Sequence, residues 1–345
     1  MAASALLSFR SETEVMHFLD PTQDFAPNER KTEIRYDPLT GRSSRILYYP
    51  FQLPPKREYT ALAKQTKGER CPFCNVDRAT PLFPGELNAQ GRFTVGQAVT
   101  FPNLFPYAGH SAVTIFSAEH FVAPTSFTPG MIADALLASQ AYLKAVRGLD
   151  KSVRAYSINW NYLPMAGGSI LHPHLQVIAG GAQTNEQREI ADRSALFYAR
   201  YGKKYGEVLV EEERERVERY VGRRGEVDWL TAFAPQGQSE FLAFFTQQDV
   251  DFFALSRQAW LDFGEGLTRL LAYLDGQGYQ AFNAALFIPA DPASGESLQL
   301  RLLPRVTLGP LETSDINYFK VLHEEALSLR PPEAVAQEAR SYFGS

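Results

Sequence analysis

One order of secondary-structure elements occurs twice along this 345-residue chain, and the repeat restricts the possible folds more than any other feature. Each copy has a helical pattern, a strand, a loop rich in small residues and a second strand, and the copies lie roughly 125 residues apart. Thr128 and Pro129 supply the N-cap and the first-turn proline of the first helix. The order predicts an α+β protein of two tandem units, each an antiparallel sheet with a helix. The predicted elements are helices at 128–147 and 250–274 and strands at 155–163, 167–180, 281–288 and 298–303, in units at 30–182 and 183–332.

The bulk composition permits a large globular enzyme. With 45% hydrophobic residues the chain can bury one large core or two moderate cores without disulfides. The net charge of −5 is mild and no run of lysines or arginines occurs, which argues against a general nucleic-acid binder. The charged segment 211–228 predicts a solvated helix without a site. Because no leader features or bilayer-spanning apolar stretch occur, we expect a soluble, cytoplasmic protein.

The segment 167–180, GGSILHPHLQVIAG, contains two of the six histidines. Side chains alternate in an extended segment, so His172, His174 and Gln176 are predicted to share one face. The proline between the histidines cannot donate to a central ladder, which indicates an edge strand or the entry to one. The small residues before it would let the phosphates of a ligand approach the backbone amides. The alternative is a surface strand whose histidines have no function.

The two cysteines, Cys71 and Cys74, occur in the order Cys-Pro-Phe-Cys. In a reducing compartment this spacing indicates a metal site or a redox dithiol, and not a structural disulfide. A redox dithiol normally opens a helix in a thioredoxin-like unit, and the residues after Cys74 do not resemble such a helix start. Zinc is therefore favoured, with a redox switch as the alternative. A tetrahedral site needs two more ligands, for which the candidates are His110, His120, His172 and His174.

Several short motifs follow one another between about residues 33 and 305. They are DPLTG, CPFC, PNLFPY, SAEH, GGS followed by HPHLQ, and WLTAFAP. In this order they resemble the galactose-1-phosphate uridylyltransferase family of the histidine-triad superfamily, which includes nucleotide-sugar phosphorylases. The combination of CPFC with HPHLQ makes the resemblance specific. It implies two histidine-triad-like units, of which the first carries the chemistry and the second lacks the catalytic histidine.

The resemblance implies a zinc site and a nucleophile. In the family the first histidine of the HPH triplet binds zinc and the second is the nucleophile, which here is His174. His110 occupies a position that the family does not use as a ligand, so we expect a solvated loop residue there. The implied zinc ligands are Cys71, Cys74, His120 and His172.

The chemistry of imidazole agrees with a nucleophilic role. A neutral imidazole can attack phosphorus and form a phosphoramidate when a hydrogen-bond acceptor holds its other nitrogen. Negative charge then grows on the phosphoryl oxygens, so hydrogen-bond donors are needed nearby. The candidate donors are Ser169, Gln176 and the amides of Gly167 and Gly168. The resemblance adds Asn103 and Asn161 as nucleotide contacts, for which a turn residue and a strand-end cap are the structural alternatives.

Three departures from the family pattern limit the substrate prediction. Gln299 and Arg301 replace a histidine pair that binds a second metal in some relatives, so no second metal is expected, and Arg301 is predicted to bind a phosphate or a carboxylate. Leu104 stands where relatives carry an aspartate near the ribose. The arginines of the sugar-phosphate site are missing. The candidate substitutes are Arg45, Lys56 and Arg57.

The sequence thus predicts a nucleotidylyltransferase with zinc as its cofactor. It would transfer a nucleoside monophosphate from a nucleotide sugar to a sugar 1-phosphate through a covalent intermediate on His174, as in galactose metabolism. One alternative is a phosphorylase or hydrolase of nucleotide sugars or dinucleoside polyphosphates, and another is a non-catalytic nucleotide-binding regulator. The expected partners are a nucleotide sugar and a sugar phosphate or phosphate, together with a second copy of the chain in a homodimer, and neither nucleic acid nor a membrane.

Overall fold

The computed structural model describes residues 6–48, 53, 55–246, 250–309 and 311–344. Residues 1–5, part of the N-terminal segment considered in the sequence analysis, lie outside these ranges. Within the described ranges no helix has both the length and the apolar character needed to cross a bilayer.

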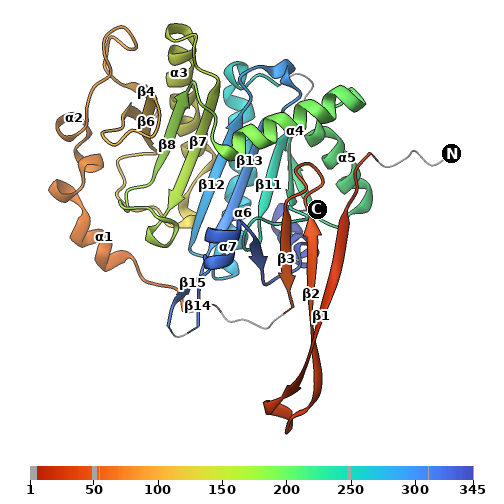
Figure 1. Ribbon diagram of the computed structural model, residues 1–345. Helices are drawn as coiled ribbons and strands as arrows, with labels where there is room; N and C mark the ends of the chain where they lie inside the picture. The colour runs from red at the N-terminus through yellow and green to blue at the C-terminus, as the bar shows by residue number, and fades with distance from the viewer. Residues whose placement is uncertain (1–5, 49–52, 54, 247–249, 310, 345) are drawn as a thin grey trace.

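A ten-stranded antiparallel sheet forms the centre of the described structure (Figure 1). Its strands are β4 (Phe93–Val95), β5 (Ala98–Pro102), β6 (His110–Ile115), β7 (Ala155–Tyr162), β8 (His174–Gly180), β9 (Tyr220–Arg224), β10 (Val227–Thr231), β11 (Phe241–Phe245), β12 (Ala281–Ile288) and β13 (Gln299–Arg305). The spatial order is β4-β5-β6-β8-β7-β12-β13-β11-β10-β9, so the two halves of the chain meet where β7 pairs with β12. Both halves follow the same order outward from this seam and share one sheet. The unit boundaries at 30–182 and 183–332 stay a prediction.

Two long helices, α3 (Pro129–Leu149) and α6 (Arg257–Gly276), cover one face of this sheet and contact each other. The predicted start of α3 is confirmed, because the Thr128 hydroxyl accepts a hydrogen bond from the N–H of Met131. The predicted start of the second helix at residue 250 is wrong. Ser256 is the N-cap of α6, and the residues before it form a short 3-10 turn.

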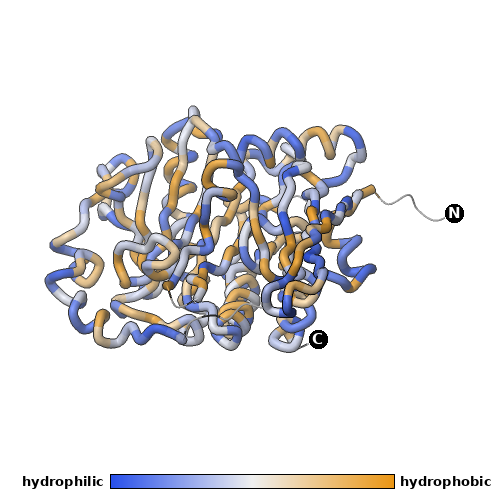
Figure 2. The backbone as a smooth tube through the Cα atoms, turned by 60° about the horizontal axis from the view of Figure 1, so that its bottom comes forward, coloured by the Kyte–Doolittle hydropathy of each residue, from blue (hydrophilic) through white to orange (hydrophobic). Residues whose placement is uncertain are grey.

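Alternation along the strands gives the sheet an apolar face and a polar face. In β7, Tyr156, Ile158 and Trp160 belong to the hydrophobic core under the helices. Asn159 and Asn161, which alternate with them, line cavities on the opposite face. Figure 2 shows hydrophobic and hydrophilic stretches interspersed along the backbone. The polar face is therefore the side of the sheet on which a ligand can meet side chains from both halves of the chain.

The histidine segment enters the interior of the sheet. β8 lies between β6 and β7, so the prediction of an edge strand is wrong. Pro173 is tolerated because the ladder with β6 begins one residue later, at His174, and does not need the missing N–H. His174 and Gln176 lie on the polar face as predicted, whereas His172 precedes the strand.

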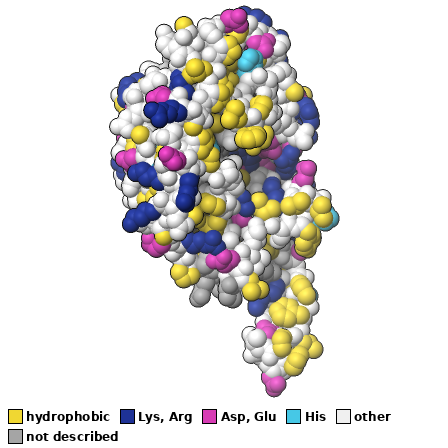
Figure 3. All heavy atoms as spheres, turned by 90° about the vertical axis from the view of Figure 1, so that its left-hand side faces the viewer, with side chains coloured by type: hydrophobic (Ala, Val, Ile, Leu, Met, Phe, Trp, Pro, Cys, Tyr) yellow, Lys and Arg dark blue, Asp and Glu magenta, His cyan; other side chains and the backbone are white. Residues whose placement is uncertain are grey.

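A second sheet of four strands, in the order β1-β2-β3-β16, carries the N-terminal hairpin. The hairpin projects from the body, and hydrophobic side chains lie along it (Figures 1 and 3). The predicted turn at 37–41 is confirmed, since the Asp37 carboxylate accepts hydrogen bonds from the N–H groups of Leu39 and Thr40. These strands are β1 (Arg10–Asp20), β2 (Ala26–Tyr36), β3 (Ser43–Leu47) and β16 (Ala326–Ser328), and a separate pair is β14 (Thr307–Leu308) with β15 (Thr313–Ser314).

The charged segment 211–228 is only partly helical and is not solvated throughout. Helix α5 (Tyr205–Arg216) ends within it, and the remainder begins the β9–β10 hairpin. Glu213 is buried and its carboxylate lies 2.7 Å from Nε of Arg219, which is also buried. Burial raises the pKa of Glu213. The other helices of the described residues are α1 (Thr60–Thr66), α2 (Val76–Ala79), α4 (Asn185–Tyr201), α7 (Tyr318–His323) and α8 (Pro332–Phe343).

Substitution of Gly266 by alanine is expected to destabilise the protein, although alanine is the better helix former. A Cβ at Gly266 would lie 2.3 Å from Nε1 of Trp229, a fully buried side chain on β10. Overpacking of this kind costs about 1–3 kcal/mol, against about 1 kcal/mol gained in helix propensity. Gly148 in α3 is the matched control, because no atom lies within 4 Å of its added Cβ. Urea unfolding should show a loss for Gly266→Ala and none for Gly148→Ala, and equal shifts would contradict this packing.

Candidate functional site

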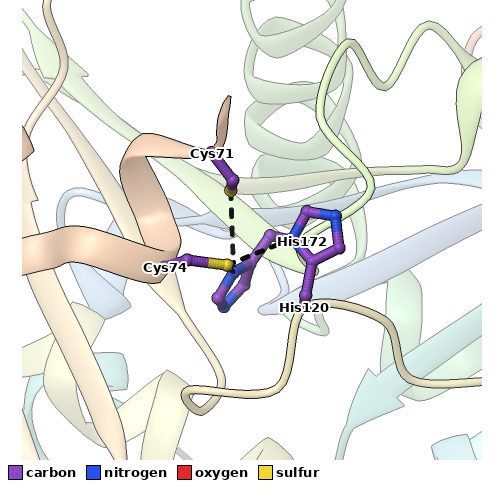
Figure 4. A group of neighbouring side chains, drawn as sticks. All are labelled: Cys71, Cys74, His120 and His172. Atoms are coloured by element: carbon purple, nitrogen blue, oxygen red, sulfur yellow. Dashed lines mark hydrogen bonds between the residues drawn. The ribbon is translucent and has the colours of Figure 1, made fainter. Parts of the chain in front are cut away.

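Four side chains that can bind a metal converge from three separate parts of the chain (Figure 4). Cys71 and Cys74 lie at a short 3-10 helix, His120 lies in the loop after β6, and His172 directly precedes β8. Their ligand atoms all lie within 4.8 Å of one another. The four residues that the family resemblance implied as ligands thus form one group.

The distances within this group fit tetrahedral zinc. Sγ of Cys74 lies 3.3 Å from Nδ1 of His120 and 3.6 Å from Nδ1 of His172. Sγ of Cys71 lies 3.9 Å from Nδ1 of His172. Tetrahedral bonds of about 2.3 Å to sulfur and about 2.0–2.1 Å to nitrogen place such ligand atoms about 3.6 Å apart. The side chains can therefore hold zinc with little rearrangement.

Both histidines of the group are oriented through their second ring nitrogen. Nε2 of His172 donates to the backbone oxygen of Ser117 at 2.8 Å, and Nε2 of His120 lies 2.9 Å from Oγ1 of Thr66. Such outer contacts fix the ring and leave Nδ1 directed at the cysteine sulfurs. Burial lowers the pKa of His172 to about 4, so its imidazole is neutral at pH 7, the form that binds a metal.

The surroundings of Cys71 argue against a redox dithiol. Cys71 is buried, and burial raises the pKa of its thiol to about 11. Reactive cysteines are instead partly exposed and have a lowered pKa. A bound cation would stabilise the thiolate, so the metal interpretation is favoured over the redox switch.

His110, one of the four histidines left open as ligands by the cysteine spacing, lies outside the metal group. It is the first residue of β6 and not a solvated loop residue as expected. Its Nε2 lies 2.9 Å from a carboxylate oxygen of Asp150. The geometry therefore favours His120 over His110 as a ligand.

His174 is held so that one ring nitrogen is free. Its Nδ1 donates to the backbone oxygen of His172 at 2.9 Å, and the ring of Phe73 packs edge-on with centroids 5.0 Å apart. Nε2 makes no hydrogen bond to any described residue, and His174 lines a cavity of about 300 Å³. Burial lowers the pKa of His174, which favours the neutral ring with its lone pair on Nε2.

Gln176 presents its amide N–H groups to the same cavity. The backbone N–H of Phe105 donates to Oδ1 of Asn103 at 3.0 Å, so the Asn103 amide nitrogen faces the other way. That nitrogen donates to Oε1 of Gln176 at 3.4 Å. The Gln176 oxygen is thus used, and its nitrogen is left for a ligand. Asn103 is itself a cavity-lining residue, as is Leu104.

The loop before the histidine segment is a tight turn that requires its glycines. Leu163 and Gly167 have positive φ, and a Cβ at Gly168 would lie 2.9 Å from the backbone oxygen of Asn161. The N–H of Gly168 donates to the oxygen of Leu163, and that of Gly167 donates to the oxygen of Pro164. The structure therefore does not support the phosphate-donor role predicted for these two amides. Ser169 is exposed and lines the His174 cavity.

The His174 cavity continues along the polar face. A second cavity of about 340 Å³ shares Tyr107 and Gln176 with it, and a third of about 310 Å³ shares Asn161 and Glu186 with the second. We call these three cavities the polar groove. Its walls include strands from both halves of the chain.

The charge of Arg301 is already matched where it lines the groove. Its guanidinium donates to Glu240 at 2.6 Å and also to Glu186. Both carboxylates belong to the protein itself, so the predicted contact of Arg301 with a ligand phosphate or carboxylate stays a prediction. The arginine substitutes predicted for a sugar-phosphate site are also paired. The pairs are Arg45 with Glu325, Lys56 with Asp275 and Arg57 with Glu312.

The structure adds groove residues that the sequence analysis missed. Phe73 packs on His174 from within CPFC, Asn283 on β12 hydrogen-bonds Asn161, and Lys320 on α7 lines the third cavity. Lys320 forms no ion pair with the described residues. Alternation along 281–288 would have placed Asn283 on the polar face, whereas no local pattern identifies Lys320.

Comparisons with known proteins establish the fold. No protein-family model matches the chain. An uncharacterized protein from Archaeoglobus fulgidus is 31% identical over 344 residues, which cover 98% of this chain and 99% of that protein. An ADP-glucose phosphorylase from Arabidopsis thaliana with bound ADP-glucose has a TM-score of 0.70 at 17% identity, over 90% of this chain and 98% of its own. A GalT-like protein from Arabidopsis thaliana has a TM-score of 0.69 at 18% identity, over 89% of this chain and 98% of its own. A uridylyltransferase has a TM-score of 0.64 at 17% identity, over 90% of this chain and 98% of its own.

Proposed function

We propose a nucleotidyl-transfer function for this chain, which belongs by fold to the galactose-1-phosphate uridylyltransferase-like proteins of the histidine-triad superfamily. His174 would carry a nucleoside monophosphate from a nucleotide sugar to a sugar 1-phosphate. One observation carries the proposal. Nδ1 of His174 donates to a backbone oxygen, which leaves Nε2 as the nucleophilic atom at a cavity.

The reaction proceeds in two displacements at phosphorus. In the first, Nε2 of His174 attacks the phosphorus that bears the nucleoside, an N–P bond forms, and the P–O bond to the sugar phosphate breaks. The sugar 1-phosphate leaves with the electron pair of that bond. The hydrogen bond from Nδ1–H of His174 to the His172 carbonyl holds the ring in this orientation and stabilises the positive charge that forms on it. In the second, an oxygen of the acceptor phosphate attacks the same phosphorus and the N–P bond breaks, which restores the neutral ring.

Side chains of the groove supply donors for the phosphoryl oxygens. Ser169 and Gln176 line the cavity of His174, and Asn161 lines the adjoining cavity. Their hydroxyl and amide N–H groups can donate to the phosphoryl oxygens as negative charge develops there. The apolar walls beside Asn103, which include Phe101 and Phe105, suit a nucleobase.

Zinc is the cofactor that the four-residue group would hold. A site with two cysteines and two histidines leaves no open position, so bound zinc would neutralise the thiolates and fix the segments that carry them. His172, as a ligand, would anchor the backbone oxygen that accepts a hydrogen bond from Nδ1–H of His174. The protein's own contribution is to place His174 two residues after His172, with Pro173 between them.

A phosphorylase is the second candidate, with inorganic phosphate as the acceptor. The observation that favours it is the pairing of Arg301 and of the three candidate sugar-phosphate cations with protein carboxylates. Among the described residues that line the groove, few free cations are then left for a second sugar phosphate, and the unpaired Lys320 suits a small anion. A nucleotide-binding regulator is the non-catalytic alternative. The homodimer and the cytoplasmic location stay predictions from the sequence.

Intact-mass measurement after brief mixing with UDP-glucose, ADP-glucose or diadenosine tetraphosphate tests the proposal. We expect the mass to rise by one nucleoside monophosphate, and the size of the increase identifies the base. The His174→Ala variant, mixed in parallel, should gain nothing. Addition of glucose 1-phosphate or of inorganic phosphate to the adduct then separates transferase from phosphorylase. Binding without adduct or consumption across these donors would favour the regulator.

A further inference from the structure

Four polar side chains form a hydrogen-bonded series across the seam between β7 and β12, namely Asn161, Asn283, Arg305 and Asp315. Asn161 and Asn283 lie directly opposite each other in the pairing, and Nδ2 of Asn283 donates to Oδ1 of Asn161 at 2.7 Å. Nη1 of Arg305 donates to Oδ1 of Asn283 at 3.0 Å. The Asp315 carboxylate, whose side chain is 6% exposed, accepts from Nη2 of the same guanidinium at 2.8 Å. The series of hydrogen bonds thus runs from the buried Asp315 carboxylate to Asn161 in the polar groove.

The charged end of this series fixes the direction of every hydrogen bond in it. A guanidinium has donors only, so the Asn283 atom that faces Arg305 must be the amide oxygen. The Asn283 nitrogen then faces Asn161, which must offer its own oxygen there. The N–H groups of Asn161 are what remains, and Asn161 is exposed to two cavities of the groove. The groove therefore meets Asn161 as a hydrogen-bond donor.

Asn283 also holds the turn that precedes the histidine segment. Its Nδ2 donates to the backbone oxygen of Ala166 at 2.8 Å. Ala166 lies between the two positive-φ residues of that turn, Leu163 and Gly167, and the turn leads directly to Ser169. One side chain from the second half of the molecule thus orients two donors that the first half presents to the groove.

We propose that Asn283, fixed by Arg305 and Asp315, is a positioning residue that aims the Asn161 N–H groups and the Ser169 turn at the phosphate oxygens of a bound nucleotide. This inference rests on the proposed function, because the nucleotide is its ligand. A phosphate oxygen only accepts hydrogen bonds, which matches an amide that can only donate toward the groove. The second half of the chain, which lacks the catalytic histidine, then contributes to phosphate binding through the seam.

A double-mutant cycle on nucleotide affinity tests the positioning role. The dissociation constants of ADP and UDP are measured by calorimetry for the wild type, Asn161→Ala, Asn283→Ala and the double variant. We expect each single substitution to weaken binding roughly tenfold, the effect of one hydrogen bond to a charged group. In the Asn161→Ala background, Asn283→Ala should add less than about threefold. An equal loss of nucleotide affinity in both backgrounds would contradict the proposal that Asn283 acts through Asn161.

Asn283→Asp separates positioning from general damage to the fold. Aspartate keeps the size of asparagine and still accepts from Arg305, but it has no N–H for Asn161 or Ala166. It should weaken ADP and UDP binding at least as much as Asn283→Ala, with an unchanged zinc content. Wild-type affinity in this variant would contradict the proposal. Asn88→Ala is the matched control, since Asn88 bonds only within its own turn, to Arg92 and Gln90, and should bind as the wild type.

The cycle also distinguishes this inference from the proposed function. A wild type that binds ADP or UDP without forming an adduct would contradict the transfer function. The coupling between Asn161 and Asn283 would then still test the positioning role of Asn283. A wild type that binds neither nucleotide would contradict both. If the adduct forms normally but the double-mutant cycle shows no coupling between Asn161 and Asn283, only the positioning role of Asn283 would be contradicted.

Discussion

Replacement of His174 by alanine is expected to lower turnover by roughly 10⁴-fold or more, because removing a covalent nucleophile removes the two-step route itself. Initial rates of UDP-glucose or ADP-glucose consumption measure the loss. Nucleotide affinity should change by less than about threefold, since the His174 ring contributes an edge contact with Phe73 and no hydrogen bond to the base pocket. The loss should therefore lie in kcat.

His110→Ala is the matched control for this prediction. His110 is also on the central sheet and also hydrogen-bonded, to Asp150, but it lies outside the metal group and does not line the His174 cavity. It should keep wild-type turnover. If His174→Ala turned over substrate as fast as His110→Ala, the covalent mechanism would have to be abandoned.

Signals within a segment predicted most helices and strands of the fold well. Features that depend on contacts between distant segments were not predicted. The Thr128 cap and the alternation in 155–163 and 281–288 are encoded within each segment, so α3, β7 and β12 have nearly the predicted bounds. The place of β8 inside the sheet depends on β6 and β7, and a proline at its entry suggested an edge. The segment 211–228 was misread for the same reason, because Glu213 and Arg219 neutralise each other only once they are buried together.

The candidate site divides along the same line. The rare and closely spaced cysteine pair indicated a metal site, and the family resemblance carried by CPFC and HPHLQ implied its four ligands and the role of His174. Hydrogen-bond partners could not be predicted in this way. The amides of Gly167 and Gly168 are used within their own turn, and Arg301 meets two carboxylates from distant segments. The link from Asn161 to Asn283 depends on the register of two strands more than a hundred residues apart.

Replacement of Cys74 by serine is expected to abolish zinc binding and to loosen one wall of the His174 cavity. The Cys74 sulfur is the ligand atom near both histidine nitrogens, and a serine hydroxyl is a poor zinc ligand. Elemental analysis should find about one zinc per wild-type chain and less than about a tenth of that in the variant. Phe73, which packs on both His174 and Phe101, then loses the anchor of its segment, so hydrogen exchange should rise there.

The same variant should form the nucleotidyl adduct slowly, because His172 holds the backbone oxygen that orients His174. A loss of roughly 10- to 100-fold is expected, smaller than for removal of the nucleophile, since the imidazole is still present. Thr66→Ala, which removes the outer contact to His120 and a hydrogen bond to the Leu62 oxygen but no metal ligand, should show a weaker form of both effects. A Cys74→Ser protein that lacks zinc but forms the adduct at the wild-type rate would mean that packing around Phe73, and not the metal, sets the position of His174.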